Sequence, residues 1–203
     1  MTELGALRTI ALKGRVSALD VASSLGLDPA DVAEQVQRLA ANGLVKEMPT
    51  GLKVTPEGKD RLAALLAAER ATIDMTAIKA IYEDFLPINS ASKEIFTAWQ
   101  LRPDGEMNDH TDADYDAAVL ANLTAVHEQV LPLVTRAATV VPRAARYADR
   151  LSDAQRRYAS GDTAYVTRPI IDSYHTVWFE LHEDLICWCG LTRAEEAAAG
   201  NAH

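Results

Sequence analysis

The N-terminal part of the chain shows apolar residues at helical spacing, divided into short segments by capping residues. Apolar positions three and four apart between residues 4 and 11 predict a first helix that ends at Gly14. A second helix is predicted over about 17–25, between a serine N-cap and a glycine. A third begins with Asp28 and a proline and ends at Asn42. The tight turn between the last two helices is typical of a helix-turn-helix.

Two short extended segments follow the third helix. Residues 44–48 and 52–54 are compatible with β-strands and flank a turn at residues 49–51, which contains proline and glycine. Thr55 and Pro56 then have the pattern of a helix start, with proline at the first helical position. The order of three helices, a β-ribbon and a further helix predicts a winged helix.

Three segments in this region carry a family resemblance. They are the cap Asp28-Pro29, the run at 36–45 (Val-Gln-Arg-Leu-Ala-Ala-Asn-Gly-Leu-Val) and the closing Val-Thr-Pro-Glu-Gly at 54–58. Residues 5–70, about a third of the chain, resemble the winged-helix domain of MarR-type and related bacterial transcriptional regulators. The resemblance implies a fold that places its recognition helix in the major groove of DNA. Winged helices also serve as protein-docking modules, and that alternative stays open.

The predicted recognition helix has one apolar stripe, so its remaining positions point outwards. The outward positions are Ala30, Glu34, Gln37, Arg38 and Ala41. Gln37 and Arg38 suit contacts with base edges or phosphate, whereas Glu34 repels phosphate. In the resembled family the positions of Ala33 and Glu34 commonly carry hydroxyl and basic residues, so this chain departs from the pattern there. On the ribbon, Lys46 and Lys53 are candidate phosphate contacts.

After the ribbon the pattern becomes helical throughout. Apolar residues at helical spacing from Pro56 to about Tyr82 predict one long connector helix, which we interpret as a dimer element. The alternative is a helix buried within the chain's own second domain. Pro87 is expected to break this helix, and Asn89 or Ser90 to cap another that runs through Trp99.

Four further helical segments are expected beyond an acidic loop. They are a long helix from Ala113 to about Val140, a helix from Pro142 to Gly161, a short piece capped by Asp162, and a last long helix opened by Pro169 and closed by Gly190. Helices of this length pack most economically as an antiparallel bundle. The predicted fold is therefore mainly α, with an N-terminal winged helix-turn-helix and small β-wing in residues 1–70. A long connector helix and a C-terminal antiparallel helical bundle follow, and residues 71–203 are expected to form a helical domain for effector binding and dimerisation.

The last long helix carries two histidines in its apolar seam, where an unpaired polar group costs free energy. Asp172 is near enough in sequence to orient His175, and Glu183 to orient His182. The candidate ligand-binding residues are Trp99, His110, His127, Asp172, Tyr174, His175, Trp178 and His182. Three interpretations stay open: hydrogen-bonded structural histidines, a pocket for a small effector with aromatic walls, or a divalent metal site. The seven-residue separation of His175 and His182, about 10 Å along a helix, weighs against a shared metal.

Charge and composition limit the classes of function that fit this chain. The 203 residues have a formal net charge of −9, and the negative excess lies after residue 70, because residues 1–70 hold 9 basic and 9 acidic side chains. A neutral DNA-binding part fits a specific dimeric regulator better than a nonspecific binder driven by phosphate contacts. The two cysteines, Cys187 and Cys189, have a spacing that is poor for a disulfide, and neither a leader nor a long apolar run is evident. These features predict a cytoplasmic protein that does not enter a membrane.

We therefore expect a homodimeric transcriptional regulator that binds double-stranded DNA and senses a small-molecule effector in its helical domain. The main alternative is an enzyme or enzyme-accessory protein, in which Asp172 and His175 form an oriented base, His182 is an acid, and the winged helix docks a protein. A third interpretation is an interaction adaptor without a ligand. The sequence leaves the effector, the operator and any metal or cofactor open.

Overall fold

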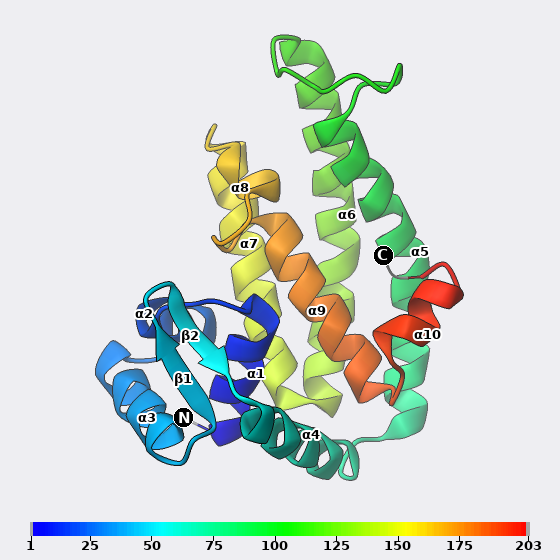
Figure 1. The fold of residues 1–203 in the computed structure, drawn as a ribbon. Helices are drawn as coiled ribbons and strands as arrows, with labels where there is room; N and C mark the ends of the chain where they lie inside the picture. Colours follow the sequence, from blue (N-terminus) through cyan, green and yellow to red (C-terminus); the bar gives the residue numbers. More distant parts are fainter. Residues whose placement is uncertain (1, 202–203) are drawn as a thin grey trace. The chain divides into compact units, whose positions relative to one another are not determined.

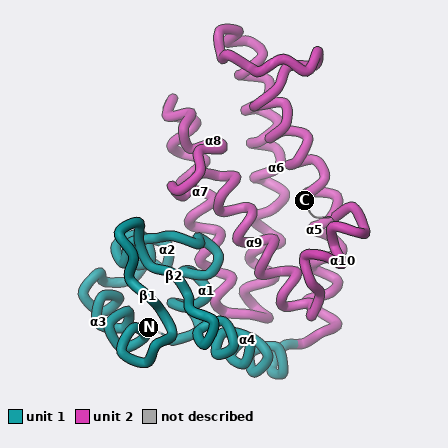
Figure 2. Tube along the Cα trace, in the orientation of Figure 1, with its two compact units in different colours: residues 1–73 teal, residues 74–203 magenta. Residues whose placement is uncertain are grey.

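The computed structural model describes residues 2–201. The chain divides into two compact units, Met1–Ile73 and Asp74–His203 (Figure 2). The domain boundary predicted after residue 70 lies close to this division. In the described part of the chain the structure is mainly helical, with one small two-stranded antiparallel sheet, and this confirms the predicted fold class (Figure 1).

Unit 1 has the element order of a winged helix. Its elements are α1 (Glu3–Lys13), α2 (Ala18–Leu25), α3 (Pro29–Ala41), β1 (Val45–Met48), β2 (Gly51–Val54) and α4 (Pro56–Arg70). Ser17 and Asp20 form a capping box at the start of α2, and Gly26 ends that helix in the left-handed conformation. Asp28 accepts a hydrogen bond from the Ala30 N–H at 2.8 Å and caps α3. The predicted caps thus form, and they fix the tight turn between α2 and α3.

The core of unit 1 is built from the apolar faces of these helices and the wing. Leu7, Ile10, Val21 and Val32 are fully buried, and Leu39 is nearly so. The strands pair in register, with the buried Val45 opposite Val54, and the N–H of Leu52 in the wing donates to the carbonyl of Val16 at 2.8 Å. The wing is therefore fastened to the helices by both apolar packing and a backbone hydrogen bond.

The prediction of one connector helix over 56–82 is wrong. Two separate helices, α4 and α5 (Met75–Gln100), occupy this segment. The Asp74 carboxylate accepts hydrogen bonds from the N–H groups of Thr76 and Ala77 at 2.9 and 3.0 Å, so it starts α5 as an N-cap. The helical spacing of apolar residues continues across Asp74, so the sequence pattern does not show where α4 ends and α5 begins. Within residues 2–201, no single helix therefore continues from unit 1 into unit 2.

Unit 2 is a helical bundle. It contains α5, α6 (Ala113–Val140), the 3-10 turn η1 (Pro142–Ala145), α7 (Arg146–Ala159), α8 (Ala164–Thr167), α9 (Tyr174–Trp188) and α10 (Arg193–Ala198). The long helices α5 and α6 pack against each other, α7 packs against α6 and α9, and α9 also contacts α5 (Figure 1). Because α9 touches several neighbours, its side chains are buried on most sides, including Leu181 and Leu185 at 0% exposure.

Two predicted helix boundaries in unit 2 are wrong. Pro87 lies inside α5, where buried residues on both sides of it, such as Phe85 and Ile95, hold one continuous helix. The last long helix begins at Tyr174, after an N-cap serine, and not at Pro169. Ile170 has a left-handed φ of 79°, which no helix tolerates, so a helix cannot start at the proline before it. The short helix α10 was not predicted.

Helix α6 is long and apolar enough, by length and composition alone, to cross a membrane. Its buried residues, Leu123 and Val130 among them, face the bundle, and the helix packs against α5 and α7.

Candidate functional site

The outward face of α3 is the candidate site in unit 1. Val32, Val36 and Leu39 are buried, as the helical pattern predicts. The residues expected to face outwards, Ala30, Glu34, Gln37, Arg38 and Ala41, are all exposed. The face therefore combines one amide, one guanidinium and one carboxylate with two small residues that allow a close approach.

Arg38 is held by its own helix. Its Nη1 lies 2.5 Å from the Glu34 carboxylate, and its Nη2 lies 2.6 Å from Oε1 of Gln35. Both partners of the ion pair are more than half exposed, so the pair contributes little free energy. Glu34 thus neutralises the single cation of this face, although an incoming phosphate can compete for it.

The wing places two lysines side by side. Lys46 and Lys53 are direct cross-strand partners, and both are exposed. Directly opposite residues of an antiparallel pair lie on the same face, and like charges there are destabilising. An anion bound over the wing relieves this repulsion, so the pair is suited to phosphate.

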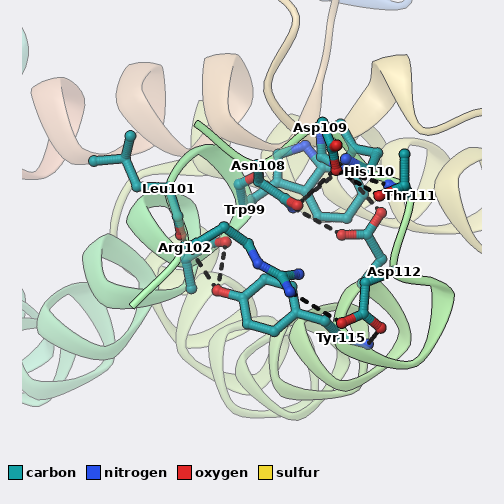
Figure 3. A network of polar contacts seen from close by, with 11 residues as sticks. Trp99, Leu101, Arg102, Asn108, Asp109, His110, Thr111, Asp112 and Tyr115 are labelled. Atoms are coloured by element: carbon teal, nitrogen blue, oxygen red, sulfur yellow. Dashed lines mark hydrogen bonds and ion pairs between the residues drawn. The ribbon is translucent and has the colours of Figure 1, made fainter. Parts of the chain in front are cut away.

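The eight residues predicted to bind a ligand in unit 2 do not form one site. His110 lies in the loop between α5 and α6, where its Nδ1 is 2.9 Å from Asp116 Oδ2 and its ring lies 4.4 Å from that of Trp99 (Figure 3). Asn108 donates from Nδ2 to Asp116 Oδ1 at 2.8 Å and to the Trp99 carbonyl at 3.2 Å. His110 adopts a left-handed φ of 58° in this network. It is thereby fixed to the end of the α5–α6 hairpin, apart from the other histidines.

A second set of contacts holds the loop between α5 and α6. Arg102 donates from Nη2 to Asp112 at 3.0 Å and its guanidinium lies 4.2 Å from the centre of the Tyr115 ring (Figure 3). The Tyr115 hydroxyl donates to the Ala98 carbonyl at 3.0 Å. A broad groove of about 710 Å³ runs beside these residues along α5. The contacts hold the loop against the helix ends, which is a structural role.

His127 and Asp172 also have structural partners. His127 Nδ1 lies 3.2 Å from the Tyr174 hydroxyl, and burial lowers the pKa of this imidazole. Asp172 accepts from Arg150 Nε at 2.8 Å, and His175 instead packs its ring on Phe96, with centroids 4.6 Å apart. The prediction that Asp172 orients His175 is therefore wrong.

The most polar part of the bundle core was not predicted. Asp184 is fully buried on α9 and bonds to Arg143, Arg146 at 3.3 Å and the Tyr147 hydroxyl at 2.6 Å. One turn earlier on the same helix, the buried Glu180 accepts from Arg150 at 2.7 Å. The sequence does contain two acidic residues four positions apart, Glu180 and Asp184. It also contains three arginines at spacings of three and four, at positions 143, 146 and 150. Charged residues are seldom buried, so this spacing alone does not indicate a buried cluster.

Three predicted residues do come together. His175, Trp178 and His182 line a small pocket of about 90 Å³ between α5, α9 and α10. The lining also includes Lys93 and Arg193, which no spacing in the sequence connects with the histidines. His175 is exposed at this pocket, whereas His182 is 5% exposed, so the expectation that both lie in the buried seam holds for His182 alone.

His182 is held through one ring nitrogen. Its Nε2 lies 3.3 Å from the Tyr82 hydroxyl, which donates to Glu196 at 2.5 Å. Because the hydroxyl proton goes to Glu196, the hydroxyl oxygen accepts from Nε2–H, and Nδ1 carries the lone pair. Glu183, the predicted partner of His182, bonds to Arg193 instead. Burial, followed by the cations of Arg193 and Lys93, lowers the pKa of His182 to about 4, so the ring is neutral at pH 7.

The metal interpretation finds no support in the described part of the chain. Among residues 2–201, no group of three or more histidine, cysteine, aspartate or glutamate side chains is placed to hold a metal ion. His110, His127 and Asp172, the proposed third ligands, each have protein partners elsewhere in unit 2.

In comparisons with protein-family models, curated proteins and solved structures, nothing matches the chain.

Proposed function

We propose that unit 1 binds double-stranded DNA through α3 and the wing, and that unit 2 binds a small molecule. The protein then acts as a ligand-responsive transcriptional regulator in the cytoplasm, as the resemblance to MarR-type regulators implies. The observation that carries the proposal is the joint exposure of the α3 face and of the opposed pair Lys46 and Lys53. Side chains on a helix suit base edges, and paired cations on a ribbon suit the adjacent phosphates.

The composition of unit 1 favours duplex over single-stranded DNA. All twelve phenylalanine, tyrosine and tryptophan residues lie after residue 73, so unit 1 has no aromatic side chain. Proteins that bind single strands stack the bases on aromatic rings, and this unit has no such platform. Its helix and wing match the groove and backbone of a duplex instead.

We further propose that the regulator is a homodimer. Unit 1 has equal numbers of acidic and basic residues, and α3 offers few base contacts, so a single copy binds weakly. Two copies double the contacts and require half-sites about one helical turn apart. Light scattering after size-exclusion chromatography measures the mass of the full chain in solution, and a monomer in the presence of duplex contradicts the proposal.

The direct test is binding of the full chain to duplex DNA from upstream of its own gene, followed by fluorescence anisotropy at low and moderate salt. We expect a saturable complex that an excess of unrelated duplex does not displace. A folded protein that binds no duplex at low salt, or binds all duplexes equally, contradicts the regulator proposal.

The wing lysines give a quantitative prediction. The double variant Lys46→Gln and Lys53→Gln is expected to reduce the slope of log affinity against log salt concentration by about 2, because two phosphate contacts are lost. The matched control is Lys59→Gln in the first turns of α4, an exposed lysine outside the wing. An unchanged slope in the double variant places the wing away from the DNA.

Replacing Glu34 is expected to strengthen duplex binding, whereas replacing the wing lysines weakens its phosphate contacts. Glu34→Gln removes a carboxylate that repels phosphate and releases Arg38 from its ion pair, so we expect duplex affinity to rise by about tenfold at low salt. Asp60→Asn on α4 makes the same charge change on an exposed residue away from α3. Equal gains in the two variants attribute the effect to net charge alone, and no gain contradicts docking through this face.

A further inference from the structure

We infer that the pocket between α5, α9 and α10 binds a short-chain monocarboxylate and that binding is coupled to uptake of one proton by His182. This deepens the proposed function, since it names the class of small molecule that unit 2 senses. It uses residues of unit 2 alone, and so it is testable without DNA.

The charge of the pocket lining selects an anion. Lys93 and Arg193 both line the pocket, and among residues 2–201 no carboxylate does. Arg193 is paired with Glu183 behind it, and the Lys93 ammonium donates to the Gly200 carbonyl at 3.3 Å. Both cations lie close enough to His182 to disfavour a charge on its ring. A carboxylate between them meets two positive groups without displacing an acidic side chain.

The remaining walls select a carboxylate with an apolar part. Phe96, Trp178 and Phe179 contribute aromatic surface, and the Arg193 guanidinium lies 4.9 Å from the centre of the Phe179 ring. Trp178 is fixed in place because its Nε1 donates to Asn89 Oδ1 at 2.9 Å. The lining therefore combines two cations with aromatic side chains, which fits an alkyl carboxylate better than phosphate or sulfate.

The size of the pocket limits the ligand. The pocket has a volume of about 90 Å³, which favours a small ligand. A carboxylate with a chain of two to four carbon atoms suits a pocket of this size. The probe of choice is therefore propionate, with acetate and butyrate as neighbours in the series.

The proton linkage follows from the position of His182. The groups that face its ring are Tyr82 and Lys93 from α5 and Arg193 and Glu196 from α10, with Glu183 on its own helix bound to Arg193. A bound carboxylate offsets the two cations and offers an acceptor to Nδ1–H. The ring then takes a proton from solvent at Nδ1, while Nε2–H keeps its bond to Tyr82. Binding and protonation therefore favour each other.

The experiment is a titration of the full-length protein with sodium propionate, followed by the NMR signals of the His182 ring at pH 5.5 and pH 7.5. We expect saturable binding that is about tenfold tighter at pH 5.5, if the bound ligand restores the ring pKa to its ordinary value near 6.5. Propionamide, which has the same shape without charge, is expected not to bind. Equal binding of propionamide, or of phosphate and chloride, overturns the inference, as does the absence of saturable binding.

Variants separate the pocket from nonspecific effects. Lys93→Met is expected to weaken propionate binding by about tenfold or more, because a charged hydrogen-bond partner is lost. Lys79→Met makes the same change on α5 outside this pocket and is expected to leave binding unchanged. His182→Asn is expected to remove the pH dependence of binding. Equal loss in the two lysine variants contradicts the assignment of the site.

The outcome for the ligand is independent of that for DNA. Propionate binding without duplex binding contradicts the regulator proposal and leaves the pocket assignment intact. Duplex binding without propionate binding contradicts the pocket assignment and leaves the regulator proposal intact.

Discussion

Replacing Asp184 with asparagine is expected to lower the free energy of unfolding of unit 2 by about 3–5 kcal/mol. The substitution keeps the shape of the side chain but removes the negative charge that Arg143 and Arg146 share in the core. Asp184 is fully buried, and the side chains of the two arginines are at most 16% exposed, so water cannot replace the lost carboxylate. Removing one member of a buried ion cluster leaves an uncompensated charge in a low dielectric.

Urea unfolding followed by tryptophan fluorescence measures this loss. Trp99, Trp178 and Trp188 all belong to unit 2, so the signal reports on that unit alone. The control is Asp153→Asn on α7, which removes an exposed ion pair with Arg157 and is expected to leave the midpoint unchanged. A variant of Asp184 that unfolds at the same urea concentration as the original protein contradicts a net stabilising role for the cluster.

Replacing Gly58 with alanine is expected to destabilise unit 1 by about 3 kcal/mol, the upper end of the cost of overpacking. A Cβ atom at this position lies 2.0 Å from the carbonyl oxygen of Leu44 and 2.8 Å from Cγ1 of Val54. The Leu44 carbonyl belongs to the backbone between α3 and the wing. This backbone cannot move without separating α4 from the wing. Lys59→Ala, at the next, exposed position, is expected to have little effect.

Unit 1 has no aromatic residue, so its unfolding is measured by hydrogen exchange of the amides of α1 and α3. We expect these amides to lose protection in Gly58→Ala while the tryptophan transition of unit 2 stays unchanged. The same variant is expected to lose duplex binding and to keep propionate binding. Full protection of α1 and α3 in the variant contradicts the packing argument.

Most of unit 1 is predictable from its sequence because its boundaries depend on local chemistry. The N-cap Asp28 and the left-handed Gly26 each act within a few residues, and the sequence shows them directly. The exposed face of α3 follows from the same periodicity that buries Val36. The missed cap at Asp74 was equally local, but the uninterrupted apolar spacing around it favoured a single helix.

The candidate site in unit 2 is predictable only in part. Spacing on one helix places Trp178 and His182 on one side, and the structure does bring them to one pocket. Spacing does not reveal which side chains of other helices lie opposite. Tyr82 is 100 residues away from His182 in the chain, yet it is the hydroxyl that holds the ring. Lys93 and Arg193 likewise reach the pocket from helices whose packing no local pattern specifies.

The sequence by itself determined the helical class, the winged helix-turn-helix and the outward face of α3, because caps and periodicity act over one or two turns. Only the tertiary structure decided that Pro87 stays within a helix, that Asp172 binds Arg150 and not His175, and that the core holds Asp184 with its arginines. These outcomes depend on contacts between distant segments. A polar side chain takes the partner that packing brings within hydrogen-bond reach, and its own helix fixes only the direction in which it points.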